Sequence, residues 1–112
     1  HKTLSKVLDD KKFLLPTIPD YATNNGHMYY LVLENKESRD KLCSYMQSKG
    51  IHTVFHYIKL HDSPFFEGKH DGRVLINAEK YEDRLIRLPF YYDLSEQDIT
   101  RVAKALTDFQ SV

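Results

Sequence analysis

The stretch HMYYLVLENKESRDKLCSYMQSKGIHTVFHY, residues 27–57, decides the fold. Its first seven residues, HMYYLVL (27–33), form a continuous β-prone run that predicts a strand buried on both faces and central in its sheet. Residues 38–49 have helical spacing, and Gly50 follows where a helix ends in the left-handed conformation. The residues of its apolar helix face are Leu42, Tyr45 and Met46. IHTVFHY (51–57) predicts a second strand, so the stretch predicts a strand–helix–strand unit with a right-handed crossover.

The segments on the N-terminal side of this unit add a helix end and an edge strand. Residues 2–11 have apolar residues at helical spacing but no cap, which is typical of the last part of a longer helix. FLLPTIPD (13–20) contains two prolines, which confine any strand there to a short or edge piece. ATNNG (22–26) has the composition of a loop.

The C-terminal side predicts a long loop and two helices. Residues 61–77 hold a proline and two glycines and predict a loop. Residues 78–88 predict a helix that ends before Pro89, after which the chain is expected to run extended. Ser95, with Asp98 three residues later, predicts the N-cap of a final amphipathic helix.

These elements predict one domain over residues 1–112. The fold class is α/β (α+β), a two-layer sandwich of a small sheet with helices mainly on one face. The 112 residues are 41% hydrophobic and 29% charged, which is typical of a soluble globular chain. Sixteen basic residues balance sixteen acidic ones, so no basic surface for nucleic acid is expected. No apolar run is long enough to span a membrane, and a single cysteine, Cys43, indicates a reducing cytoplasm.

Six histidines raise the hypothesis of a zinc site. His52 and His56 are four residues apart and would converge on one ion only in a helix, because zinc–nitrogen bonds are ~2.0–2.1 Å long. In the predicted strand four residues span ~13 Å. A metal site is therefore not expected, although zinc content after purification without chelator would test it. The plain structural interpretation of His56 is a strand-end histidine that is hydrogen-bonded to the backbone.

Catalytic machinery is not evident in the chain. Cys43 lies inside the predicted helix beside Leu42, which favours a small half-buried residue over a reactive thiol. The four glycines match no phosphate-binding pattern, and the acidic pair Glu82 and Asp83 lies on a charged helix face. We therefore expect no catalytic residue and no autonomous enzyme.

Three motifs, in this order and spacing, resemble the C-terminal part of the DegT/DnrJ/EryC1/StrS family of pyridoxal-phosphate-dependent sugar aminotransferases. They are NNGHMYYLVL, GIHTVFHYIKLH and RLIRLPFYYDLSEQDITRVAKAL, and together they cover nearly the whole chain. The resemblance is strongest to the dTDP-4-amino-4,6-dideoxygalactose transaminase branch. It implies the small C-terminal domain of fold-type I aminotransferases, in which the large domain, absent here, binds the cofactor.

The resemblance also implies site residues. His56 matches the position that faces the cofactor and nucleotide-sugar pocket, and Tyr57 and His61 extend that wall. Asn25 and His27 match the family's N-x-H before the central strand and are expected at the pocket edge. The Schiff-base lysine belongs to the large domain, so neither Lys6 nor Lys59 is expected in that role. Lys59 stands where close relatives have proline, which changes the local loop.

For the whole enzyme, the resemblance implies transfer of an amino group, from glutamate, to a 4-keto-6-deoxyhexose nucleotide such as dTDP-4-keto-6-deoxyglucose. This chemistry serves lipopolysaccharide or other cell-surface polysaccharide biosynthesis. The implied partners are the chain's own large domain and a second subunit in a homodimer, and the 112-residue fragment is expected to bind no pyridoxal phosphate and to be inactive alone. The aromatic residues expected at exposed positions are Phe65, Phe66, Tyr91 and Tyr92. The alternative is a free-standing ligand-binding module with a ferredoxin-like sheet.

Overall fold

The computed structural model describes residues 3–8, 11–55 and 57–111. None of its described helices is both long and apolar enough to cross a membrane. The elements in chain order are α1 (Leu4–Val7), β1 (Phe13–Leu14), β2 (Tyr30–Leu33), α2 (Lys36–Ser48), the 3₁₀ turns Leu60–Asp62 and Pro64–Phe66, α3 (Ile76–Arg84), β3 (Leu85–Arg87) and α4 (Glu96–Gln110).

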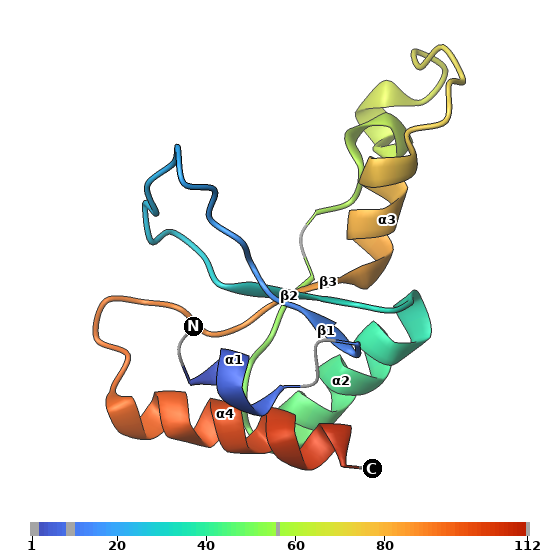
Figure 1. The fold of residues 1–112 in the computed structure, drawn as a ribbon. Coiled ribbons are helices and arrows are strands. Elements are labelled where there is room, and N and C mark those ends of the chain that lie inside the picture. Colours follow the sequence, from blue (N-terminus) through green and yellow to red (C-terminus); the bar gives the residue numbers. More distant parts are fainter. Residues whose placement is uncertain (1–2, 9–10, 56, 112) are drawn as a thin grey trace.

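The sheet is three-stranded and antiparallel, with β2 in the centre between β1 and β3. Phe13 pairs with Leu33 on one side of β2, and Leu31 pairs with Ile86 on the other. Figure 1 shows α1, α2 and α4 together on one side of the sheet, while α3 extends away from them. The expected α+β architecture and the short edge strand are therefore confirmed, and the predicted central strand is confirmed over Tyr30–Leu33, three residues shorter than predicted.

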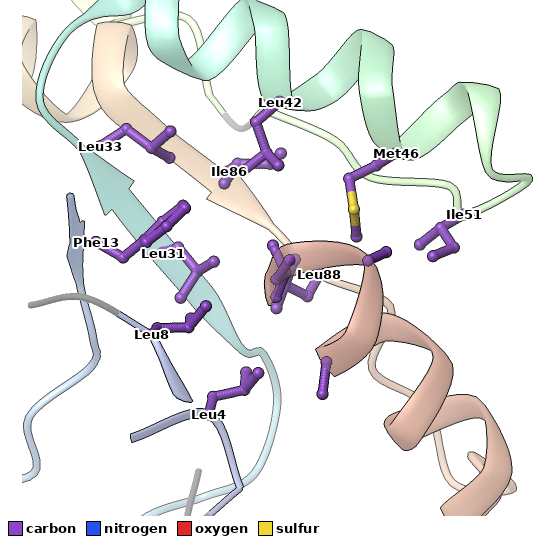
Figure 2. Close-up of a cluster of buried hydrophobic side chains, with 13 residues drawn as sticks. Leu4, Leu8, Phe13, Leu31, Leu33, Leu42, Met46, Ile51, Ile86 and Leu88 are labelled. Atoms are coloured by element: carbon purple, nitrogen blue, oxygen red, sulfur yellow. The ribbon is translucent and has the colours of Figure 1, made fainter. Parts of the chain in front are cut away.

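One hydrophobic core joins the sheet to this helical layer (Figure 2). The central strand is largely buried, with Leu31, Val32 and Leu33 each no more than 4% exposed. Burial of an aliphatic side chain contributes about 1.5–3 kcal/mol, so these contacts hold the layers together. The buried residues of this cluster are Leu4, Leu8, Phe13, Leu31, Leu33, Leu42, Met46, Ile51, Ile86, Leu88, Ala103, Ala105 and Leu106.

Helix α2 has defined caps at both ends. At its start the Asn35 side chain accepts a hydrogen bond from the Ser38 N–H at 2.8 Å, which begins the helix two residues before the predicted position. At its end Gly50 adopts a φ of 68°, as the sequence predicts. Arg101 of α4 donates a hydrogen bond to the Lys49 carbonyl oxygen at 2.6 Å. This bond satisfies a terminal carbonyl and attaches the two helices to each other.

Helix α4 begins as the sequence predicts. Ser95 is the N-cap, and its hydroxyl oxygen accepts a hydrogen bond from the Asp98 N–H at 3.1 Å. The same hydroxyl donates to the Asp98 carboxylate at 2.6 Å. The cap fixes the start of the helix whose inner face supplies Ala103, Ala105 and Leu106 to the core.

Replacing this cap tests its contribution. We expect Ser95→Ala to lower the free energy of unfolding by about 1 kcal/mol, because an orphan helix N–H loses its partner. The matched control is Ser44→Ala, an exposed serine inside α2, where alanine should be neutral or stabilising by about 0.5 kcal/mol. Urea denaturation followed by circular dichroism measures both, and equal effects of the two substitutions would contradict the capping role.

The predicted strand over residues 51–57 is wrong for the residues that the structure describes. Only Val54 forms a ladder pair there, and it pairs antiparallel with Arg87. Val54 N–H donates to the Arg87 oxygen at 3.2 Å, and Arg87 N–H donates to the Val54 oxygen at 2.7 Å. The segment runs in the same direction as β2, but β3 occupies the place beside β2. The second strand of the predicted strand–helix–strand unit is therefore reduced to one bridge, which lies on the outer side of β3.

The predicted helix over residues 78–88 is also too long at its end. α3 stops at Arg84, and the next three residues form β3. Their backbone pairs with β2, and Leu88 N–H then donates to the Tyr29 oxygen at 3.0 Å. Ile86 is fully buried as a result. Pairing with the central strand overrides helix propensity, and Pro89 already disfavours a helical Leu88. The following residues up to Ser95 form no described strand.

Two segments project from the sheet and position the residues expected in the site. Residues 15–29 connect β1 to β2, and residues 57–75 connect the Val54 pair to α3. Figure 1 shows them as separate projections, the first in blue to teal and the second in green to yellow. We call the second projection, residues 57–75, the arm. The predicted loops over 22–26 and 61–77 are confirmed, except that α3 already begins at Ile76.

Candidate functional site

The residues expected to form the pocket wall do not lie in one place. His56 lies outside the described residues. Tyr57 and His61 belong to the arm, whereas Asn25 and His27 belong to the other projection. A hollow of about 540 Å³ contains Asn25 and His27 in its lining but neither Tyr57 nor His61. Within this chain the structure therefore presents two separate candidate surfaces.

Asn25 and His27 form a local hydrogen-bonded pair. The Asn25 side-chain oxygen lies 2.9 Å from His27 Nδ1 and accepts a second, longer bond from the His27 backbone N–H at 3.4 Å. Asn24 forms a similar turn, in which its side-chain oxygen accepts from the Gly26 N–H at 2.8 Å. Gly26 has a φ of 62°, a conformation that glycine adopts at little cost. These bonds hold the two side chains beside each other at the start of β2.

Tyr57 and His61 have contrasting environments on the arm. Tyr57 is 70% exposed. His61 is only 12% exposed and stacks on His70, with ring centroids 4.8 Å apart and an angle of 30° between the planes. Gly72 N–H donates to His70 Nδ1 at 3.1 Å. His61 therefore supports the arm from inside, and Tyr57 presents the outer face.

His70 is a member of this arrangement that the sequence did not indicate. It lies nine positions after His61, in a loop without helical or strand periodicity that would place the two rings together. Only the tertiary fold of the arm brings them into contact.

Lys59 attaches the arm to α3. Its ammonium lies 3.1 Å from Asp62 Oδ2 and 3.3 Å from Glu82 Oε2. The hydrogen bond with Asp62, supported by that with Glu82, raises the pKa of Lys59 above its ordinary value. A Schiff-base lysine must react as the neutral amine. Lys59 therefore fits a structural ion pair and does not fit the lysine that pyridoxal phosphate requires.

Metal and thiol chemistry have little support in the part of the chain that the structure describes. No three histidine, cysteine, aspartate or glutamate side chains among those residues gather so as to hold a metal ion. Cys43 is half-buried in α2 and packs against the core, as expected from its position beside Leu42. Its environment is that of a small core residue.

Several aromatic side chains point away from the core. Phe65 on the arm is 71% exposed, and Tyr92 after β3 is fully exposed. Tyr91 is exposed as well, which confirms the expectation for these three residues. Phe66 differs, because it is half-buried and meets Phe65 edge to face, with ring centroids 5.4 Å apart. Exposed aromatic surface of this kind is typical of a region that another protein surface covers.

Comparison with solved structures extends this picture. The chain aligns with S. venezuelae DesV, solved in complex with a ketimine intermediate, at 25% identity and a TM-score of 0.86, covering 99% of this chain and 30% of DesV. A DegT DnrJ EryC1 StrS aminotransferase from Brucella abortus aligns at 26% identity with a TM-score of 0.77, covering 99% and 28%. NtdA from Bacillus subtilis, with bound cofactor PMP, shares the fold at 18% identity and a TM-score of 0.81, covering 99% and 26%.

Two further facts set the scope of these similarities. The chain spans only 26–30% of the length of the three solved chains. The family model described as the DegT/DnrJ/EryC1/StrS aminotransferase family matches residues 1–107, almost the entire sequence. The chain belongs to the DegT/DnrJ/EryC1/StrS aminotransferase family.

Proposed function

We propose that this chain is the C-terminal small domain of a longer pyridoxal-phosphate-dependent sugar aminotransferase. The observation that supports this best is the family match over residues 1–107, together with near-complete coverage of the chain by only a fraction of each solved enzyme. In this proposal a large domain precedes the chain and contains the Schiff-base lysine. The alternative of a free-standing binding module has less support, because the chain corresponds to only 28–30% of the length of the solved chains it matches.

The proposed reaction moves an amino group from glutamate to a 4-keto-6-deoxyhexose nucleotide such as dTDP-4-keto-6-deoxyglucose. The product would be the dTDP-4-amino-4,6-dideoxygalactose type of sugar, used in cell-surface polysaccharides. The ketimine in DesV and the PMP in NtdA support pyridoxal chemistry in the longer protein. The cofactor supplies the electron sink for amino transfer. Lys59 lies within the motif of the proposed wall, but its ion pairs do not suit a lysine that forms a Schiff base with pyridoxal phosphate. No step of the reaction is therefore assigned to this chain.

The proposed contribution of this chain is to the substrate pocket. Tyr57, with His61 behind it and with His56, would form one part of the wall, and Asn25 with His27 would form another. The separation of the two surfaces is compatible with a pocket completed by the large domain and by a second subunit of a homodimer. The exposure of Phe65 and Tyr92 supports such covering surfaces.

Amino-transfer assays test this function. We expect the longer protein to convert glutamate and dTDP-4-keto-6-deoxyglucose to 2-oxoglutarate and an amino sugar nucleotide, and we expect no turnover from the 112 residues alone. Lys59→Arg in the longer protein is the matched control, because arginine keeps both ion pairs and activity should stay within about twofold. Turnover by the short chain, or complete loss of activity in Lys59→Arg, would contradict the proposal.

A further inference from the structure

Asn25 precedes Gly26 in a turn that is open to water. Residues 24–27 are all exposed, and Gly26 has a φ of 62°. The side-chain amide of an asparagine can react with the backbone nitrogen of the next residue, and a side chain on that residue hinders the approach. Glycine has no Cβ, so its nitrogen stays accessible. Asn25 is the only one of the four asparagines in the chain that precedes a glycine.

The hydrogen bonds of Asn25 fold its side chain towards the Gly26 peptide. Asn25 Oδ1 accepts from the His27 backbone N–H at 3.4 Å and lies 2.9 Å from His27 Nδ1. Both partners belong to the residue after Gly26, so the side-chain carbonyl group reaches forward along the chain. The turn therefore holds Asn25 Cγ on the side of the Gly26 nitrogen.

The same hydrogen bonds stabilise the charge that a ring closure develops. When a nitrogen adds to an amide carbonyl group, negative charge gathers on the oxygen, and preorganised donors lower the barrier. An amide oxygen only accepts hydrogen bonds, so the His27 Nδ1 beside it must donate. Asn25 Oδ1 therefore already has a backbone donor and an imidazole donor. The Gly26 N–H donates to Asn24 Oδ1 at 2.8 Å, which polarises the N–H bond of the attacking nitrogen.

We propose that Asn25–Gly26 is a site of spontaneous covalent modification, at which Asn25 becomes aspartate or isoaspartate. The Gly26 nitrogen forms a bond to Asn25 Cγ and gives up its proton to water. The Cγ–Nδ2 bond breaks, and the nitrogen leaves as ammonia with a proton from water. A second water then opens the succinimide ring at either carbonyl group, and no oxidant or reductant is needed. Both products add a carboxylate beside His27, and isoaspartate also adds one carbon atom to the backbone before β2.

Two other positions in the chain each lack part of this arrangement. Asp71 forms the same turn, since its Oδ1 accepts from the Arg73 N–H at 3.1 Å and Gly72 has a φ of 81°. Its carboxylate, however, is ion-paired with Arg73 Nε at 3.2 Å, and an ionised carboxylate is a poor target for a nucleophile. Asn35 precedes no glycine, and its side chain caps α2. We therefore expect both positions to react more slowly than Asn25.

Incubation of the 112-residue chain in mildly basic buffer, followed by peptide mapping with mass spectrometry, tests the proposal. We expect Asn25 to lose its amide at least about tenfold faster than Asn24 and Asn35, which corresponds to a barrier lower by about 1.4 kcal/mol. Isoaspartate, detected with an isoaspartyl methyltransferase, should form together with aspartate at position 25, because both arise from one ring. Equal rates at Asn24 and Asn25, or aspartate without isoaspartate, would overturn the proposal.

A free peptide of residues 21–30 separates the sequence from the turn. It has the same neighbours of Asn25 without the fixed hydrogen bonds, so the folded chain should react at least as fast as the peptide. A slower reaction in the folded chain would show that the turn protects Asn25, and it would overturn the proposal.

Three variants test the individual groups, each with circular dichroism as a check of folding. Gly26→Ala should slow the reaction at least about tenfold, because a Cβ crowds the nitrogen, although it would meet no atom beyond the neighbouring residues within 4 Å. His27→Phe keeps the backbone donor, loses the imidazole donor and should slow the reaction about threefold or more. The matched control is His52→Phe, at another exposed histidine, which should react as the native chain does. An unchanged or faster reaction in His27→Phe would also overturn the proposal.

Discussion

Replacing Leu42 with alanine should lower the free energy of unfolding by about 2–5 kcal/mol, because the substitution removes buried methyl groups and leaves a cavity. Leu42 is fully buried on the inner face of α2, in the cluster that also contains Met46 and Ile86. It lies where the helical layer meets the sheet (Figure 2). A domain of this size has a free energy of unfolding of about 5–15 kcal/mol, so the expected loss is a large share of that total.

The matched control is Leu14→Ala, the same chemical change at a residue of β1 that is 53% exposed. We expect this control to cost less than about 1 kcal/mol, because little apolar surface leaves the interior. Urea denaturation followed by circular dichroism measures both variants. The midpoint should fall for Leu42→Ala with an unchanged slope, which shows that stability and not compactness has changed. Equal midpoints for the two variants would refute the assignment of Leu42 to the core.

Much of the helical layer follows from local sequence signals. Ser95 begins α4 as predicted, because its hydroxyl is close enough in sequence to satisfy the Asp98 N–H. Gly50 ends α2 as predicted, because the left-handed conformation there favours glycine. The uninterrupted run in β2 predicts a central strand, and both neighbours do pair with it. For the two helix ends the deciding interaction lies within a few residues of the signal.

Strand neighbours could not be predicted in the same way. Residues 51–55 have a β-prone composition and residues 85–87 a helical one, yet the structure forms the full strand from the second segment. The structure places β3 beside β2, and only Val54 pairs with the outer side of β3. That choice depends on which segment buries its side chains against α2, which is a tertiary property. Ile86 is fully buried in the result, whereas Phe55 is 48% exposed.

The buried arginine of α2 shows a similar limit of sequence reasoning. Arg39 is 4% exposed, although its neighbours on the helix, Lys36 and Asp40, are exposed. Its guanidinium lies 4.8 Å from the ring centroid of Phe55, and its Nε lies 2.9 Å from an Asp40 carboxylate oxygen. A charged residue at a helical position normally predicts the solvent face. The Asp40 carboxylate and the ring of Phe55, which arrives from another segment, together compensate the buried charge.

The arrangement of the expected site residues could not be predicted from the sequence. The N-x-H motif placed Asn25 and His27 at the pocket edge, which stays a prediction, and the structure shows that the two side chains bond to each other in a turn. The HYIKLH motif gave no indication that His61 turns inward to His70. It also did not show that Lys59 would bind Glu82 of α3, since that contact spans 23 positions of the chain.

Gly50→Ala should lower the free energy of unfolding by about 2–3 kcal/mol. About 1–2 kcal/mol arises because an L-residue with a side chain is disfavoured at a φ of 68°. A further loss of about 1 kcal/mol is expected because the substitution disturbs the hydrogen bond by which Arg101 caps α2. A Cβ at position 50 would lie 3.0 Å from Arg101 Nη2, the atom that donates to the Lys49 oxygen at 2.6 Å. The new methyl group would displace this bond between α4 and α2.

Gly68→Ala separates the two causes, because Gly68 has a φ of 70° and a Cβ added there would meet no atom within 4 Å. That variant should lose only the backbone contribution of about 1–2 kcal/mol. A third variant, Arg101→Met, keeps much of the side-chain length without the donor and should cost about 1 kcal/mol. In the double variant Gly50→Ala/Arg101→Met the two losses should be less than additive, because both remove the same bond. Fully additive losses in urea denaturation would show that Gly50→Ala does not act through the hydrogen bond of Arg101.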